Sequence, residues 1–206
     1  STRNQRLACI HGFYRYLQIE DPVGLLPYQQ ILSIPIKKTQ TPTIHHLTPE
    51  ALKLILAQPD LSRPNGRRDL TLLCVLYDTG ARVQELVDLC VGDVRLAPPP
   101  ILTLTGKGRK KRLVPVMQNT EALLKQYMDE AFPVQDGMQE QPLFFNQQHR
   151  KMTRAGISYI LNKYVSQART KSSIIPGKVT PHVVRHTKAM MLLRAGVSLI
   201  YIRDIL

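Results

Sequence analysis

Apolar side chains recur at helical spacing along most of the chain. Residues 2–19 carry Leu7, Ile10 and Tyr14 on one stripe, and residues 153–168 carry a longer apolar stripe. Spacings of three and four residues are typical of amphipathic helices. The same pattern predicts further helices over residues 48–57, 67–79, 82–89, 119–131 and 181–195, and one that starts at Ser198. The chain is therefore predicted to be mainly helical.

One short stretch alternates apolar and polar residues instead. Ile101 to Thr105 and Arg112 to Val116 read as two strands, joined by a connector rich in glycine and lysine. Two such runs around a turn predict an antiparallel β-hairpin. These are the only clear strands in the sequence, so the expected fold class is mainly α with a small antiparallel β-hairpin or sheet (α+β).

A segment with four prolines separates the first helix from the rest. Residues 21–46 contain Pro22, Pro27, Pro35 and Pro42 among β-branched residues. Proline lacks a backbone N–H and fixes φ, so this stretch suits an extended connection better than a regular element. We place a domain boundary here, with residues 35–46 as the linker between residues 1–34 and residues 47–206.

The composition excludes several protein classes. The chain has 206 residues, of which 43% are hydrophobic, enough for a buried core. No apolar run is long enough to cross a bilayer, and no secretion signal is visible, so we expect a cytoplasmic protein without a membrane partner. Cys9, Cys74 and Cys90 lie among apolar residues at wide spacing, which favours buried thiols over disulfides or a metal site.

Positive charge is concentrated in two blocks. The net charge is +13; residues 101–116 hold five basic and no acidic residues, and residues 142–206 hold eleven basic residues and only Asp204. Such an excess favours a polyanion as partner, most often nucleic acid. A soluble protein that is merely basic is the alternative.

The string Thr79-Gly80-Ala81-Arg82-Val83-Gln84-Glu85 suggests an anion site. Gly80 allows a sharp turn, and Arg82 and Glu85 share a face of the following helix. Glu85 could hold the arginine so that it offers its fork to an oxyanion. An ordinary helix ion pair is the alternative here.

Two further sites could serve proton transfer to or from a phosphate. Lys107 lies between two glycines at the hairpin tip and could donate a proton, or serve with its neighbours as generic phosphate contacts. His182 and Arg185 share one side of the first turn of a helix, where anions are favoured. A capped surface helix is the alternative for that pair, and His186 is expected to be a packed structural histidine.

Together, TGARVQEL at 79–86, LTGKGRKKRLVPV at 104–116 and TPHVVRHTKAMMLLRAGVSLIYIRDIL at 180–206 resemble the tyrosine recombinase (phage integrase) family. The resemblance covers 47–206 as the catalytic domain, and 1–34 looks like the end of the family's helical core-binding domain. It implies site-specific recombination, as in integration or transposition, by DNA cleavage and rejoining through a 3′-phosphotyrosine, without metal or nucleotide cofactor. The resemblance implies that Arg82 and Arg185 clamp the phosphate and that Glu85 braces Arg82. Lys107 would be the general acid, with Lys110 as fallback. His182 would assist proton transfer and hold the phosphate. The expected DNA-binding residues are Arg3, Arg6, Arg109, Lys110, Lys111 and Arg112.

The resemblance also implies binding partners, and the sequence departs from the family pattern at its C-terminal end. Double-stranded DNA with paired inverted repeats would be the substrate, and relatives act as tetramers. The sequence ends at Leu206, before the family's Gly-His pair and nucleophilic tyrosine, and Tyr201 does not replace that tyrosine. We therefore expect residues 1–206 to bind DNA without cleaving it, as a monomer or dimer. A non-catalytic DNA-binding or regulatory protein and a type IB topoisomerase are the alternatives.

Overall fold

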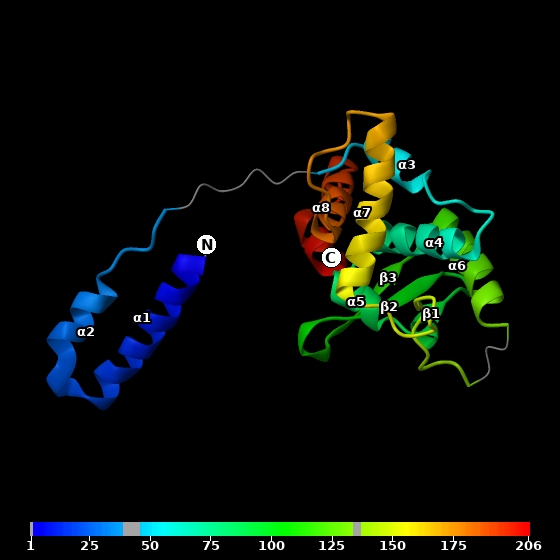
Figure 1. The fold of residues 1–206 in the computed structure, drawn as a ribbon. Helices are drawn as coiled ribbons and strands as arrows, with labels where there is room; N and C mark the ends of the chain where they lie inside the picture. Colours follow the sequence, from blue (N-terminus) through cyan, green and yellow to red (C-terminus); the bar gives the residue numbers. More distant parts are fainter. Residues whose placement is uncertain (1, 39–45, 134–136) are drawn as a thin grey trace. The chain divides into compact units, whose positions relative to one another are not determined.

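The computed structural model describes residues 2–38, 46–133 and 137–206, except for the side chains of Pro22 and Lys107. The chain divides into two compact units, residues 1–43 and 44–206 (Figure 1). Much of the predicted linker, residues 39–45, lies outside the described residues.

The first unit is a pair of helices. Helix α1 spans Thr2–Glu20, a 3₁₀ turn (η1) spans Pro22–Gly24, and α2 spans Leu25–Leu32. The extended connection predicted from residue 21 onward is therefore wrong for α2. Pro22 begins the 3₁₀ turn and Pro27 lies in the first turn of α2, where a proline removes no helical hydrogen bond.

The packing of α1 differs from its predicted stripe. Leu7 and His11 are its buried residues, whereas Ile10 is 45% exposed. His11 Nε2 lies 3.2 Å from the carbonyl oxygen of Ile31, so a polar contact joins the two helices. Cys9 on the same helix is exposed, against the expectation of a buried thiol, and Cys74 and Cys90 are half-buried free thiols.

The second unit confirms the predicted helices, with boundaries shifted by a few residues. Its helices are α3 (Pro49–Leu56), α4 (Pro64–Thr79), α5 (Val83–Asp88), α6 (Gln118–Ala131), α7 (Arg154–Lys171), α8 (Pro181–Arg194) and α9 (Leu199–Ile205). The side-chain oxygens of Thr48, Thr153 and Thr180 accept hydrogen bonds from the first turns of α3, α7 and α8.

Helix α4 is the central element of this unit and packs against α3, α6 and α8 (Figure 1). Because neighbours surround it, side chains on nearly all of its faces are buried, including the polar Asp69, Thr71 and Asp78. Each of these polar groups has a hydrogen-bond partner; Tyr164 of α7, for example, donates to Asp69 Oδ2 over 2.8 Å.

The sheet contains the predicted hairpin and one additional strand. Strands β2 (Ile101–Thr105) and β3 (Lys111–Pro115) are antiparallel, and the two-residue β1 (Val94–Arg95) pairs with the other edge of β2. Strand β1 was missed because two residues show no alternation. A short 3₁₀ turn, η3 (Lys107–Arg109), forms the hairpin tip. No helix among the described residues is long and apolar enough to cross a membrane.

Candidate phosphate-binding site

The turn after α4 positions the first candidate arginine. Gly80 ends α4 in the left-handed region, with φ 57° and ψ 28°, a conformation that glycine adopts without steric cost. Two residues later Arg82 is the N-cap residue, directly before α5. Its side chain is 59% exposed, so most of the guanidinium faces solvent.

Glu85 lies beneath Arg82 and is 3% exposed. Its Oε2 accepts the backbone N–H of Arg82 over 2.8 Å, and its Oε1 accepts a hydrogen bond from Arg82 Nη1 over 3.0 Å. Burial by itself would raise the pKa of Glu85, but hydrogen bonds from Arg112 and Arg82 outweigh it and lower the pKa to about 2. Glu85 is therefore a carboxylate throughout the physiological range.

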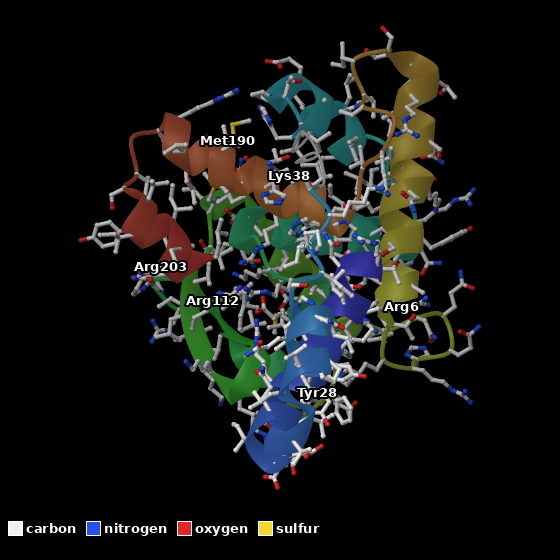
Figure 2. All side chains as sticks on the ribbon, turned by 90° about the vertical axis from the view of Figure 1, so that its left-hand side faces the viewer. Arg6, Tyr28, Lys38, Arg112, Met190 and Arg203 are labelled. Atoms are coloured by element: carbon white, nitrogen blue, oxygen red, sulfur yellow. The ribbon has the colours of Figure 1, made fainter. Side chains whose placement is uncertain are left out.

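Arg112 is the second partner of Glu85. Its Nη1 and Nη2 donate to Oε1 and Oε2 over 2.8 and 2.7 Å, and its Nε donates to the carbonyl oxygen of Ile205 over 3.0 Å. Figure 2 shows Arg112 between the strands and α9. Arg112 is among the DNA contacts expected from the sequence, but here its side chain is only 17% exposed. The alternation of side chains along the strand could have predicted this burial. Arg112 is two residues before the buried Val114, so the two side chains lie on the same face of β3.

Arg185 approaches the same place from α8. Its Nη1 donates to the carbonyl oxygen of Gly80 over 2.7 Å, and its Nη2 donates to the carbonyl oxygen of Leu206. Burial, with the positive charges of Arg82 and Arg112, lowers the pKa of Arg185 to about 10. Arg82 and Arg112 thus bond to Glu85, and Arg185 lies near enough for the charges of all three to act on it. The cluster holds three guanidinium groups and one carboxylate, so its net charge is positive.

His182 lies one turn before Arg185 and pairs with His186. The Nε2 atoms of the two rings are 2.8 Å apart, and the ring planes are nearly perpendicular. One ring must donate and the other accept at this distance. Burial, His182 and Arg185 lower the pKa of His186 below its ordinary value. His186 therefore contacts His182 directly. The sequence predicts a packed structural role for His186 and does not predict this contact.

The hairpin tip begins beside this cluster. A Cβ added at Gly106 would lie 3.1 Å from Glu85 Oε1, so the backbone that leads into Lys107 packs against the buried carboxylate. The side chain of Lys107 lies outside the described part of the structure. Arg109 and Lys110 are exposed on the same connector, and Lys111 is exposed at the start of β3. Arg3 and Arg6 are exposed on α1 in the other unit.

One ion pair behind the cluster was not foreseen. Lys188 Nζ lies 3.0 Å from Asp78 Oδ1, and both side chains are nearly buried. Nothing in the sequence indicates that α8 and α4 bring these residues together, since the pairing depends on how the two helices pack.

The site is open rather than enclosed. A concavity of about 480 Å³ is lined by Asn65 and Arg68 near the other end of α4, and none of the cluster's arginines lines it. Arg68 there is already paired with the buried Asp69, so Lys163 is the remaining cation among the residues that line the concavity, against three arginines in the cluster. The chemistry therefore favours the arginine cluster, and an exposed guanidinium at a surface suits a macromolecular phosphate. Among the described residues no group of three or more His, Cys, Asp or Glu side chains is placed to hold a metal ion.

Comparison with known proteins gives a consistent result. The Phage integrase family matches residues 45–206. The integrase/recombinase y4rC of Sinorhizobium fredii is 36% identical over 96% of this chain and 58% of its own length, and tyrosine recombinase XerC of Oceanobacillus iheyensis is 34% identical over 98% and 65%. The chain thus spans about three fifths of the length of these relatives. The crystal structure of XerH site-specific recombinase bound to its difH substrate superposes with a TM-score of 0.65 at 26% identity, over 84% of this chain and 49% of XerH.

Proposed function

Because the chain belongs to the phage integrase family, we propose that it is part of a site-specific DNA recombinase that cleaves and rejoins strands through a 3′-phosphotyrosine. The observation that carries this proposal is the bond from Arg185 to the carbonyl oxygen of Gly80, 105 residues away in the sequence. This bond brings Arg185 near Arg82, whose charge acts on it. XerH is bound to its difH substrate in a pre-cleavage complex, and the likeness of this chain to XerH supports double-stranded DNA as the partner.

The proposed chemistry is a transesterification at a DNA phosphate. A tyrosine hydroxyl gives its proton to His182 as its oxygen attacks the phosphorus, the bond to the 5′-oxygen breaks, and the tyrosine becomes linked to the 3′-phosphate. The departing 5′-oxygen takes a proton, for which we assign Lys107 as donor with Lys110 as fallback. The reverse attack by a 5′-hydroxyl releases the tyrosine and seals the strand, so the bond energy is retained.

The arginines would stabilise the charge that develops on the phosphate. Arg82 offers the N–H groups that Glu85 does not occupy, and Arg185 is fixed by the Gly80 carbonyl. Fixed donors around a pentacoordinate phosphorus need little reorganisation during the reaction. His182, at the start of α8, would hold a phosphate oxygen or assist proton transfer.

The remaining basic residues would bind the DNA backbone. Exposed Arg109, Lys110 and Lys111 on the hairpin, with Arg3 and Arg6 on α1, are proposed to contact phosphates. We propose that residues 1–206 by themselves bind inverted-repeat DNA without cleaving it, as a monomer or dimer, and that tetramers form on paired sites. Such a protein would act in the bacterial cytoplasm, in association with the nucleoid.

A suicide substrate, nicked so that cleavage traps the covalent product, tests the proposal. A polypeptide that contains residues 1–206 and a nucleophilic tyrosine should form this product, and Arg82→Lys or Arg185→Lys should abolish it with modest loss of DNA affinity. Arg203→Lys is the matched control, since Arg203 is an exposed arginine that forms an ion pair with its neighbour Asp204.

Three outcomes would contradict parts of the proposal. A covalent product from residues 1–206 alone would refute the requirement for a further tyrosine. Relaxation of any supercoiled plasmid, without preference for paired inverted repeats, would favour a type IB topoisomerase. Specific DNA binding without cleavage by any longer form would favour a regulatory protein.

A further inference from the structure

Arg112 directs three of its five N–H donors to partners inside the protein. Its guanidinium bridges both oxygens of Glu85 and also reaches the carbonyl of Ile205, in a site where the Glu85 side chain is 3% exposed. We propose that Arg112 is a positioning residue that keeps Arg82 available to the scissile phosphate, and that it does not contact DNA. This inference rests on the proposed recombinase function and assigns a new role within the same site.

The division of Glu85 between two arginines is the basis of this role. Arg112 binds both carboxylate oxygens side by side, whereas the Arg82 side chain makes a single bond through Nη1. A carboxylate and a guanidinium prefer two parallel hydrogen bonds when both oxygens are free. Without Arg112, Glu85 would be free to take Arg82 in that bidentate manner and withdraw its fork from the phosphate.

The hairpin fixes Arg112 in this position. Arg112 pairs with Leu104 of β2, and the side chains of Leu104 and Val114 on the same face are buried. Gly106, at the start of the hairpin tip, packs against the Glu85–Arg112 pair, where an added Cβ would lie 3.9 Å from Arg112 Nη1. Arg112 therefore links the strand that follows the tip to α5 and to the end of α9.

DNA binding separates this role from a phosphate contact. Each lost phosphate contact lowers the slope of log affinity against log salt by about one. Arg112→Gln in residues 1–206 should leave that slope unchanged, whereas Lys111→Gln, on the exposed neighbouring face of β3, should reduce it. A slope reduced by one in Arg112→Gln would overturn the inference and leave the proposed function intact.

Cleavage measures the positioning effect. In a polypeptide that also supplies the tyrosine, Arg112→Gln should lower the cleavage rate on bound DNA by about 100-fold, as expected for a displaced catalytic group. Adding Glu85→Gln should restore part of that rate, because a neutral amide cannot hold Arg82 by charge. Simple loss of structure would instead make the double variant worse than either single variant.

Arg112→Lys is the second variant if Arg112→Gln does not fold. It keeps the charge beside Glu85 but cannot bridge both oxygens, so it should also reduce cleavage while the salt slope stays unchanged. An unaltered cleavage rate in a folded Arg112 variant would overturn the inference. Absence of cleavage by the unsubstituted protein would instead count against the proposed function.

Discussion

Lys188 of α8 and Asp78 of α4 form an ion pair in which Nζ and Oδ1 lie 3.0 Å apart, with the side chains 11% and 3% exposed. The second oxygen of Asp78 accepts the backbone N–H of Met117 over 2.7 Å. Asp78 therefore connects the end of α4 to α8 and to the residue before α6. Since Lys188 follows Arg185 by three residues, the pair also holds the helix that carries Arg185 against α4.

Removing one partner of this pair should destabilise the protein strongly. Lys188→Met leaves a buried carboxylate without its counter-ion, and we expect a loss of about 3 kcal/mol in the free energy of unfolding. Adding Asp78→Asn, which removes the charge but keeps an acceptor for Met117, should recover at least half of the loss. Urea unfolding of the single and double variants measures both values, and additive losses would contradict a coupled pair.

The ionisation of Glu85 predicts how stability depends on pH. The pKa of Glu85 is about 2 in the folded chain, below its ordinary value of 4.5. A lowered carboxyl pKa stabilises the folded state above pH 4.5 and loses that contribution as pH falls towards 2, a difference of about 3 kcal/mol.

The measurement is urea unfolding of residues 1–206 between pH 6 and pH 2. Part of the acid destabilisation should disappear in Glu85→Gln, which cannot titrate. Asp204→Asn, on an exposed side chain, is the control and should keep the pH dependence of the unsubstituted chain. Equal pH dependence in Glu85→Gln and the unsubstituted chain would show that Glu85 has no such shift.

Elements whose pattern reflects local burial were predictable. In α7, the six buried residues are those of the predicted apolar stripe, because one face of this helix packs on the core and the other faces water. In α4, the predicted single apolar face was wrong, because helices on several sides bury polar residues as well. The spacing of apolar residues identifies a helix that buries one face. It does not predict which residues are buried in a central helix such as α4.

The site residues divide in a similar way. Arg82, Glu85 and Arg185 could be proposed because glycine turns and helix starts mark them in the sequence. The alternation along β3 also predicts that Arg112 points inward, like Val114. The basic residues around Arg112 suggested instead that it faces solvent. The Lys188–Asp78 pair could not be foreseen, because it depends on the tertiary packing of α4 and α8.

Gly80 should be sensitive to the smallest substitution. Alanine at this position would have to adopt φ near 57°, and its Cβ would meet the side chain of Leu206. We expect Gly80→Ala to lower the free energy of unfolding by about 1–2 kcal/mol, mainly through backbone strain, because a leucine side chain can move aside. Gly177→Ala is the control, since nothing lies within 4 Å of a Cβ added at Gly177. Thermal unfolding that ranks the two variants equally would contradict this prediction.

The histidine pair predicts a measurable coupling at the start of α8. Burial, His182 and Arg185 all lower the pKa of His186, so this ring is neutral near neutral pH and can share a hydrogen bond with His182. Replacing His182 by alanine removes one of the three causes, and the pKa of His186 should rise partway towards 6.5. An NMR titration of the ring resonances of residues 1–206 measures this shift directly.

His149→Ala, at a loop far along the chain, is the control for this titration and should leave His186 unchanged. The same result in His182→Ala would mean that the two rings do not interact. A rise in the pKa of His186 would show that the two rings interact. The Nε2 proton that His182 could donate to a phosphate oxygen would then be shared in a hydrogen bond with His186. Protonation of His186 at low pH should then leave this ring unable to accept a hydrogen bond from His182.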